Sequence, residues 1–251
     1  MTVHTSSSPI SLREWVSRGL NFQRRGQAST AMACYEQALS LEPGNPDVQQ
    51  LYGVALLAKG YHVRAAQALS AAAALLPTFA PVHLNLGLAL HQTKDYDGAI
   101  TAFQKAVDLD PSLKIAYRNM ANTRMDQGLF EEAVKLYEQY HSGTPGDVQI
   151  WPNMIQCHIR LGSKAGAVTA ASRAIRAGAN DLNFWEHVVD IYREFGPYEH
   201  MLHMYSYIAS RWPDAADAAQ NLAIEALQHE DLVIGWHLYG ARFHAKRPQG
   251  T

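Results

Sequence analysis

The sequence predicts an all-α protein, an α-solenoid of seven helical hairpins that follow one another along the chain. The main observation is an internal repeat: from Leu12 onward the chain aligns with itself every 34 residues, without an insertion or a deletion. The repeats begin at Leu12, Pro46, Ala80, Lys114, Val148, Leu182 and Ala216. The composition also favours helix, because Ala and Leu are plentiful and runs of β-branched residues are scarce. We therefore expect a disordered polar tail over residues 1–11 and a solenoid over residues 12–249.

Small side chains recur at two positions of the repeat, where they allow the two helices of a hairpin to approach closely. The eighth position carries Gly19, Gly53, Gly87, Ala121 and Ala223, and the twentieth carries Ala31, Ala65, Ala99, Ala133 and Ala167. Larger side chains stand at the fourth, seventh, eleventh and twenty-fourth positions, where we expect them to fill the space between hairpins. The fourth position includes Trp151 and Trp185, and both rings are expected to be buried.

The ends of the expected helices are marked by glycine and proline. Glycine at the fifteenth position suits a helix end that needs a positive φ, and it occurs at Gly26, Gly60, Gly128, Gly162 and Gly196. Proline at the thirty-second position cannot continue the second helix and so begins the connection to the next repeat. Bulky residues such as Ile155 and Val189 replace the small one at the eighth position in the later repeats. We therefore expect a less regular stack after about residue 140.

This pattern resembles the tetratricopeptide-repeat family over nearly the whole chain. The resemblance implies a right-handed superhelix with a concave groove, lined by the first helix of each hairpin and occupied by a protein or peptide partner. The sixth position, which faces that groove in the family, carries Ser17, Leu51, Asn85, Asn119, Asn153, His187 and Asn221. Asparagine is a mediocre helix former, and its amide both donates and accepts hydrogen bonds. The column resembles the asparagine ladder by which some members hold a peptide backbone; alternatively, the position is exposed and merely tolerates asparagine.

Two further features belong to the expected groove. Arg118, Asn122 and Asn153 fit three places of the clamp by which chaperone-binding members hold a terminal carboxylate, but His187 stands where that clamp needs a cation. Earlier in the chain the expected groove is apolar. This part would give affinity to a partner or would cover the N-terminal tail of the same chain, and it consists of Leu51, Val54, Leu57, Leu84 and Leu88.

Several classes of function are disfavoured. The formal net charge of −2 argues against a nucleic-acid-binding face. Pro77 and Pro81 interrupt the longest stretch without charged residues, so we expect no membrane span. Cys34 and Cys157 are too far apart in the repeat to pair, and no secretory signal precedes the repeats, so we expect free thiols and a cytoplasmic protein.

No catalytic motif, cofactor site or metal site is expected. Asp108 and Asp110 mimic a metal–nucleotide motif, but they fall at the end of a repeat. His200 and His203 lie three residues apart, and no third or fourth ligand stands at a suitable spacing. We therefore expect a scaffold or adaptor without enzymatic activity.

Two alternatives stay open. In the first alternative, the chain is the substrate-recognition region of a larger enzyme, such as a glycosyltransferase, with the catalytic part absent. It is based on residues 231–243, which resemble the helix that joins repeats to a catalytic domain in some bacterial glycosyltransferases. In the second alternative, the chain associates with itself. The same final helix is unusually apolar, and we expect it to be covered by a following domain, a second copy or a partner.

Overall fold

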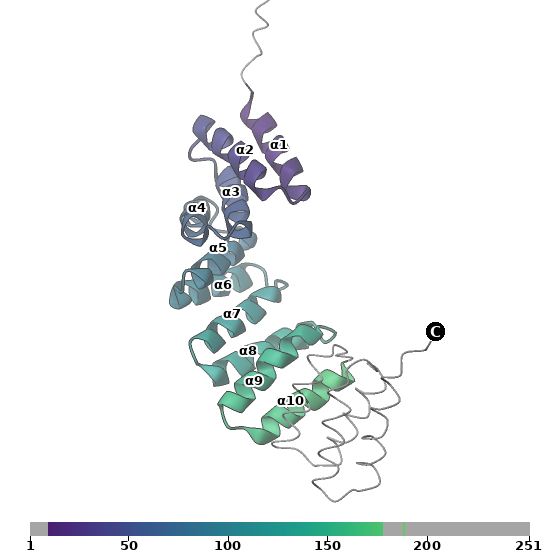
Figure 1. Cartoon of the computed structure of the whole chain (residues 1–251). Helices are drawn as coiled ribbons and strands as arrows, with labels where there is room; N and C mark the ends of the chain where they lie inside the picture. The colour runs from purple at the N-terminus through teal and green to yellow at the C-terminus, as the bar shows by residue number, and fades with distance from the viewer. Residues whose placement is uncertain (1–9, 178–187, 189–251) are drawn as a thin grey trace, which may run out of the picture. The chain divides into compact units, whose positions relative to one another are not determined.

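The computed structural model describes residues 10–177 and Val188, and all the regular elements in this part of the chain are helices (Figure 1). The predicted all-α solenoid is confirmed there. Residues 1–9 of the expected tail and, apart from Val188, the two hairpins expected over residues 182–249 lie outside the described residues. The helices are α1 (Leu12–Arg24), α2 (Ala28–Leu41), α3 (Pro46–Ala58), α4 (His62–Leu75), α5 (Ala80–Gln92), α6 (Tyr96–Leu109), α7 (Ile115–Asp126), α8 (Phe130–Gly143), the 3₁₀ turn η1 (Val148–Ile150), α9 (Trp151–Arg160) and α10 (Lys164–Arg176).

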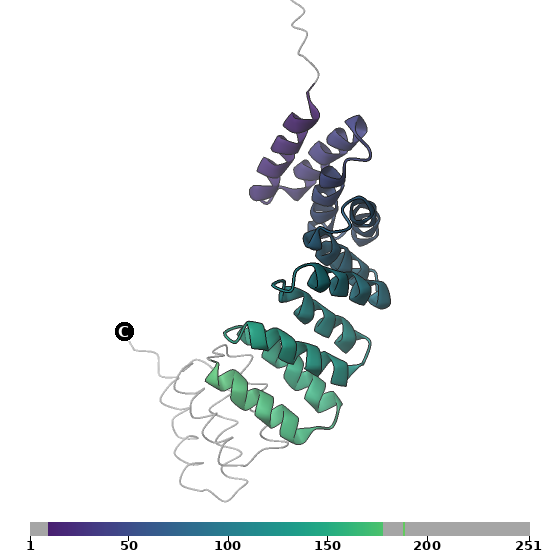
Figure 2. The ribbon, with the colours of Figure 1, turned by 180° about the vertical axis from the view of Figure 1, so that it is seen from behind.

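Consecutive helices pair into hairpins, and the chain divides into two compact units at Gly143. In the first unit, α1 pairs with α2, α3 with α4, α5 with α6, and α7 with α8. Within this unit, α2 then packs on α3, α4 on α5, and α6 on α7. In the second unit α9 pairs with α10. Figure 2 shows these pairs from behind.

The contact between the eighth and twenty-fourth positions explains the small residues of the repeat. An added Cβ on Gly53 would lie 2.5 Å from Cγ of Leu69, and one on Gly87 would lie 2.5 Å from Cδ1 of Phe103. Leu69 and Phe103 have no exposed surface. The first helix of each of these hairpins therefore approaches the second closely enough for a large buried side chain to rest on glycine.

Left-handed backbone closes each hairpin turn of the described repeats. Four glycines at the fifteenth position have φ values of 66° to 77°, namely Gly26, Gly60, Gly128 and Gly162. In the third repeat the same position is Lys94, with a φ of 64°. The geometry of the turn is therefore kept where the sequence lacks the glycine that favours it.

Replacing Lys94 by glycine is expected to stabilise the first unit by roughly 0.5–1 kcal/mol. The relief of strain at a non-glycine residue in the left-handed region outweighs the extra backbone entropy that glycine loses on folding. Urea unfolding followed by circular dichroism measures the change. The reverse substitution at the matching position, Gly60→Lys, is the control and is expected to destabilise by about 1 kcal/mol; a loss of stability in Lys94→Gly would contradict the assignment of strain.

The repeat becomes less regular at the start of the second unit. The fifth repeat opens with the 3₁₀ turn η1, and its α-helix begins only at Trp151. Ile155 takes the eighth position here and is 4% exposed. Trp151 has no exposed surface, as predicted, whereas Trp185 lies outside the described residues.

The uncharged stretch around Pro77 and Pro81 forms parts of two separate helices. α4 ends at Leu75, and α5 begins at Ala80 with Pro81 in its first turn. In the described part of the chain, no helix has the length and apolar character needed to cross a bilayer.

Candidate functional site: the first-helix face

The candidate site of the first unit is the face formed by α3, α5 and α7, the first helices of three successive hairpins. α5 contacts α3 and α7 directly, in addition to the second helices on which it packs. We define the first-helix face as the residues at the fifth, sixth, ninth, twelfth and thirteenth repeat positions of these three helices. The sequence places most of the predicted partner-binding residues on this face.

The part of this face on α3 and α5 is apolar. Leu51 on α3 is half-buried and packs against the core of the first two hairpins. Leu84 and Leu88 on α5 are half-buried and pack against the cluster around Phe103. These three leucines therefore support the core with one side and leave the other side accessible.

Two of the predicted asparagines occupy equivalent places on adjoining helices. Asn85 on α5 and Asn119 on α7 hold the sixth position of successive repeats, and both are half-buried. Within residues 10–177, neither side-chain amide makes a hydrogen bond. Each amide can therefore donate and accept a hydrogen bond to a bound molecule.

Asn122 and Arg118 of the same helix already have partners inside the fourth hairpin. The Tyr137 hydroxyl donates a hydrogen bond to Oδ1 of Asn122. The Arg118 guanidinium lies 5.7 Å from the centroid of the Tyr140 ring, within the range of a cation–π interaction. Both side chains therefore join α7 to α8, a structural role that the predicted carboxylate clamp does not include.

A polar network that the sequence analysis missed connects α5 to α7. The Thr123 hydroxyl has no exposed surface and donates to the Asn119 carbonyl oxygen at 2.8 Å. His91 Nδ1 lies within hydrogen-bonding distance of the same hydroxyl oxygen, at 3.0 Å. His91 Nε2 lies 3.3 Å from Asp126 Oδ2. The network fixes the spacing between the two helices that carry Asn85 and Asn119.

Only a weak sequence signal pointed to this network. His91 and Asp126 stand at the twelfth and thirteenth positions, which face the groove in the family, but Thr123 stands at the tenth. A buried threonine inside a helix often donates its hydroxyl to a carbonyl one turn earlier.

The other predicted partner-binding residues belong to other parts of the chain. Asn153 belongs to α9 in the second unit, where it is half-buried. His187 and Asn221 lie outside the described residues. The first unit therefore brings together Asn85 and Asn119, with the three leucines on the preceding part of the face.

The remaining titratable candidates have structural partners. Asp110 accepts hydrogen bonds from the amide and hydroxyl of Ser112, and these bonds hold the pKa of its carboxyl below the usual value. Cys34 and Cys157 are buried free thiols, and burial raises the pKa of Cys157 to about 11. In the described residues, no group of three or more His, Cys, Asp or Glu could hold a metal ion; His200 and His203 lie beyond them.

Comparison with curated proteins finds relatives that share the repeat region. The chain is 30% identical over 129 residues to the heat-shock protein cognate co-chaperone sgt12 of Aspergillus fumigatus, a match that covers 51% of this chain and 36% of the relative. It is 28% identical over 137 residues to the BBSome complex member BBS4 of Xenopus tropicalis, which covers 55% of this chain and 27% of the relative. The matches thus span about a third or less of each relative.

Solved structures share the fold. A crystal structure of MamA has a TM-score of 0.60 and 23% identity, with 63% of this chain and 93% of MamA covered. The thermophilic tetratricopeptide-repeat protein TTC0263 of Thermus thermophilus has a TM-score of 0.54 and 14% identity, with 72% of this chain and 98% of that protein covered. At these identities the likeness concerns the fold alone.

Family models describe more than half of the chain. One model of the tetratricopeptide repeat matches residues 80–113, the clearest repeat, and a second model of the same repeat matches residues 16–80 and 118–181. The matched ranges coincide with the helical hairpins of both units. The chain therefore belongs to the tetratricopeptide-repeat family.

Proposed function

We propose that the chain is a protein–protein interaction scaffold that binds an extended segment of a partner on the first-helix face. The observation that carries this proposal is the repetition of Asn85 and Asn119, half-buried at the same position of adjoining helices, with side-chain amides that make no hydrogen bond among the described residues. Amides spaced by one repeat suit the alternating donors and acceptors of a peptide backbone, whatever the side chains of that peptide.

The apolar part of the face supplies the second component of binding. Apolar side chains of the partner would bury surface against Leu51, Leu84 and Leu88, while the amides would fix the path of its backbone. The family membership supports a protein partner, as do the printed names of two relatives, a co-chaperone and a member of a protein complex. We extend the proposal to residues 182–249 as two further hairpins, and to the cytoplasm as the place of action.

A scaffold also explains the titratable groups better than catalysis does. The acidic and histidine side chains of the first-helix face are engaged in holding helices together, as His91 and Asp126 are. The alternative, the recognition region of a larger enzyme, rests on residues 231–243, which lie outside the described residues. Binding of a partner segment on this face is expected under both alternatives.

Replacing Asn85 and Asn119 together by alanine is expected to weaken peptide binding about thirtyfold. Each lost hydrogen bond contributes about 1 kcal/mol, or about fivefold in Kd. The probe is a peptide selected from a random library for binding to the full chain, and the measurement is isothermal titration calorimetry. Helicity is expected to be unchanged, because alanine is the better helix former.

Asn21→Ala is the matched control, because Asn21 is an exposed asparagine on α1, outside the first-helix face. This variant is expected to bind the peptide as the wild type does. Equal affinities of the double variant and the wild type would show that the asparagine column is merely tolerated. A loss of affinity that accompanies a loss of helicity would also count against a direct contact.

A further inference from the structure

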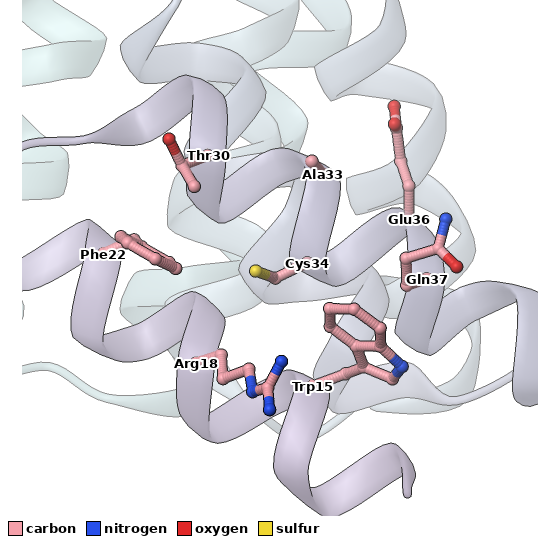
Figure 3. Close-up of a pocket in the computed structure, with 8 residues that line it drawn as sticks. All are labelled: Trp15, Arg18, Phe22, Thr30, Ala33, Cys34, Glu36 and Gln37. Carbon is pink, nitrogen blue, oxygen red and sulfur yellow. The ribbon is translucent and has the colours of Figure 1, made fainter. Parts of the chain in front are cut away.

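A groove lies on the first hairpin, away from the first-helix face of α3, α5 and α7. It has a volume of about 700 Å³ and a mostly apolar surface. Figure 3 shows Trp15 and Phe22 on the two sides of the Cys34 thiol. The lining residues come from α1 and α2 and are Trp15, Arg18, Phe22, Thr30, Ala33, Cys34, Glu36 and Gln37.

The spacing of the lining residues gives the groove a direction. On α1 they recur at intervals of three and four residues, from Trp15 to Phe22. On α2 they run from Thr30 to Gln37 and include Ala33, Cys34 and Glu36. Seven residues of helix span roughly 10 Å, or two turns. The groove therefore runs along both helices for two turns, which is the form of surface that receives a third helix.

The corresponding face of later hairpins is covered by a helix. α2 packs on α3, α4 on α5, and α6 on α7. The seventh repeat position on the covered faces is Tyr52, which is 8% exposed, Leu86, which is half-buried, and Met120, which is 2% exposed. On the first hairpin that position is Arg18, which is exposed. The groove is therefore a continuation of the interface between hairpins, and among residues 10–143 no helix covers it.

The covered interface between the first two hairpins indicates the charge of the missing helix. There, Glu36 of the covering helix accepts hydrogen bonds from the Tyr52 hydroxyl at 2.5 Å and from Arg64 at 3.0 Å. An acidic residue at the equivalent place of an incoming helix would meet Arg18. The existing partner of Arg18 is Glu14, at 2.7 Å, in an exposed pair of small energy.

We propose that this groove binds an amphipathic α-helix of a partner protein, seated as α2 is seated on α3, with an acidic residue opposite Arg18. Residues 1–11 of the chain itself are a poor occupant, because Pro9 stands near their end and they lack an apolar stripe of two turns. The Cys34 thiol at the bottom of the groove is uncharged, because burial raises its pKa. The positive charge of Arg18 acts in the opposite direction but is the smaller effect.

The test uses the full chain and a labelled peptide with the sequence of residues 27–42, in which Cys34 is replaced by alanine. This peptide reproduces the helix that covers the second hairpin, and a side-chain lactam on its opposite face keeps it helical, since so short a helix is marginal alone. Fluorescence anisotropy is expected to show saturable binding. Ala33→Arg in the full chain is expected to weaken binding at least tenfold, because the exposed Ala33 lines the groove.

The matched control is Ala74→Arg, at an exposed alanine of α4 outside the groove, which is expected to leave binding unchanged. A charge swap tests the orientation: Arg18→Glu is expected to weaken binding, and a Glu36→Lys peptide is expected to restore it. Absence of saturable binding, or equal effects of Ala33→Arg and Ala74→Arg, would overturn the proposal. The groove would then be a solvent-exposed surface of the first hairpin. A dimer that Ala33→Arg abolishes in light scattering would also overturn it, in favour of a second copy.

Discussion

Replacing Gly87 by leucine is expected to destabilise the first unit by about 3 kcal/mol or more. An added Cβ would already lie 2.5 Å from the Phe103 ring, and a leucine side chain has three more carbon atoms beyond its Cβ. The ring has no free space to enter, because it packs against Val107, Ala116 and Met120 in a buried cluster. Urea unfolding measures the loss, and hydrogen exchange read by mass spectrometry locates it to α5 and α6.

The control for this substitution is Gly44→Ala, in the loop before α3. No atom lies within 4 Å of an added Cβ there, and the residue does not need a positive φ. Its expected effect is within about 0.5 kcal/mol. Equal urea midpoints for Gly87→Leu and Gly44→Ala would mean that the hairpin opens to admit a bulky side chain. The contact between the eighth and twenty-fourth positions would then not determine the separation of the helices.

The sequence predicted a close approach of the two helices at the eighth position, although it assigned the twenty-fourth position to the space between hairpins, whereas Phe103 rests on Gly87 within one hairpin. The eighth and twenty-fourth positions belong to two helices joined by a short turn, so a constant spacing of 34 residues fixes both the length of the helices and the point where they cross. The same reasoning located the turns that glycine marks, whereas the left-handed conformation of Lys94 became known only from the structure. The recurrence of small residues at one repeat position was therefore enough to predict that the two helices pack closely, without knowledge of any distance.

The roles of individual polar side chains could not be predicted in this way. Arg118 and Asn122 matched a family clamp by their positions, yet they contact Tyr140 and Tyr137 on the partner helix of their own hairpin. A hydrogen bond depends on the rotamers of both side chains and on the offset of the two helices, and neither follows from the repeat spacing. The position of a residue in the repeat indicates on which face of the helix it lies. It does not indicate which atoms its side chain contacts.

The two proposed binding surfaces of the first unit arise from different consequences of stacking. The first-helix face is formed because α5 contacts both α3 and α7, so residues of one repeat position stand in a row. The groove on the first hairpin is formed because the surface that a helix covers on later hairpins of this unit recurs on the first one. A partner on one surface therefore leaves the other accessible, and Ala33→Arg is expected to leave binding on the first-helix face unchanged.

Trp151→Ala is expected to produce the largest loss of stability in the second unit, about 3–5 kcal/mol, as for other buried tryptophans. The Trp151 ring has no exposed surface, and the Arg173 guanidinium of α10 lies 5.0 Å from its centroid. The substitution therefore leaves a large cavity and removes a cation–π interaction between α9 and α10. Hydrogen exchange of the α9 and α10 amides measures the effect where it arises, since a repeat protein need not unfold in a single step.

Trp15→Ala is the matched control, at the fourth position of the first repeat. Trp15 is only half-buried, and its Arg18 contact is at the surface, 5.4 Å from the ring centroid. We expect a loss of roughly 1–2 kcal/mol, because less apolar surface returns to water and the remaining space opens to solvent rather than forming a cavity. Equal losses for the two tryptophans would contradict this account, since repeat position rather than burial would then determine the contribution of the ring.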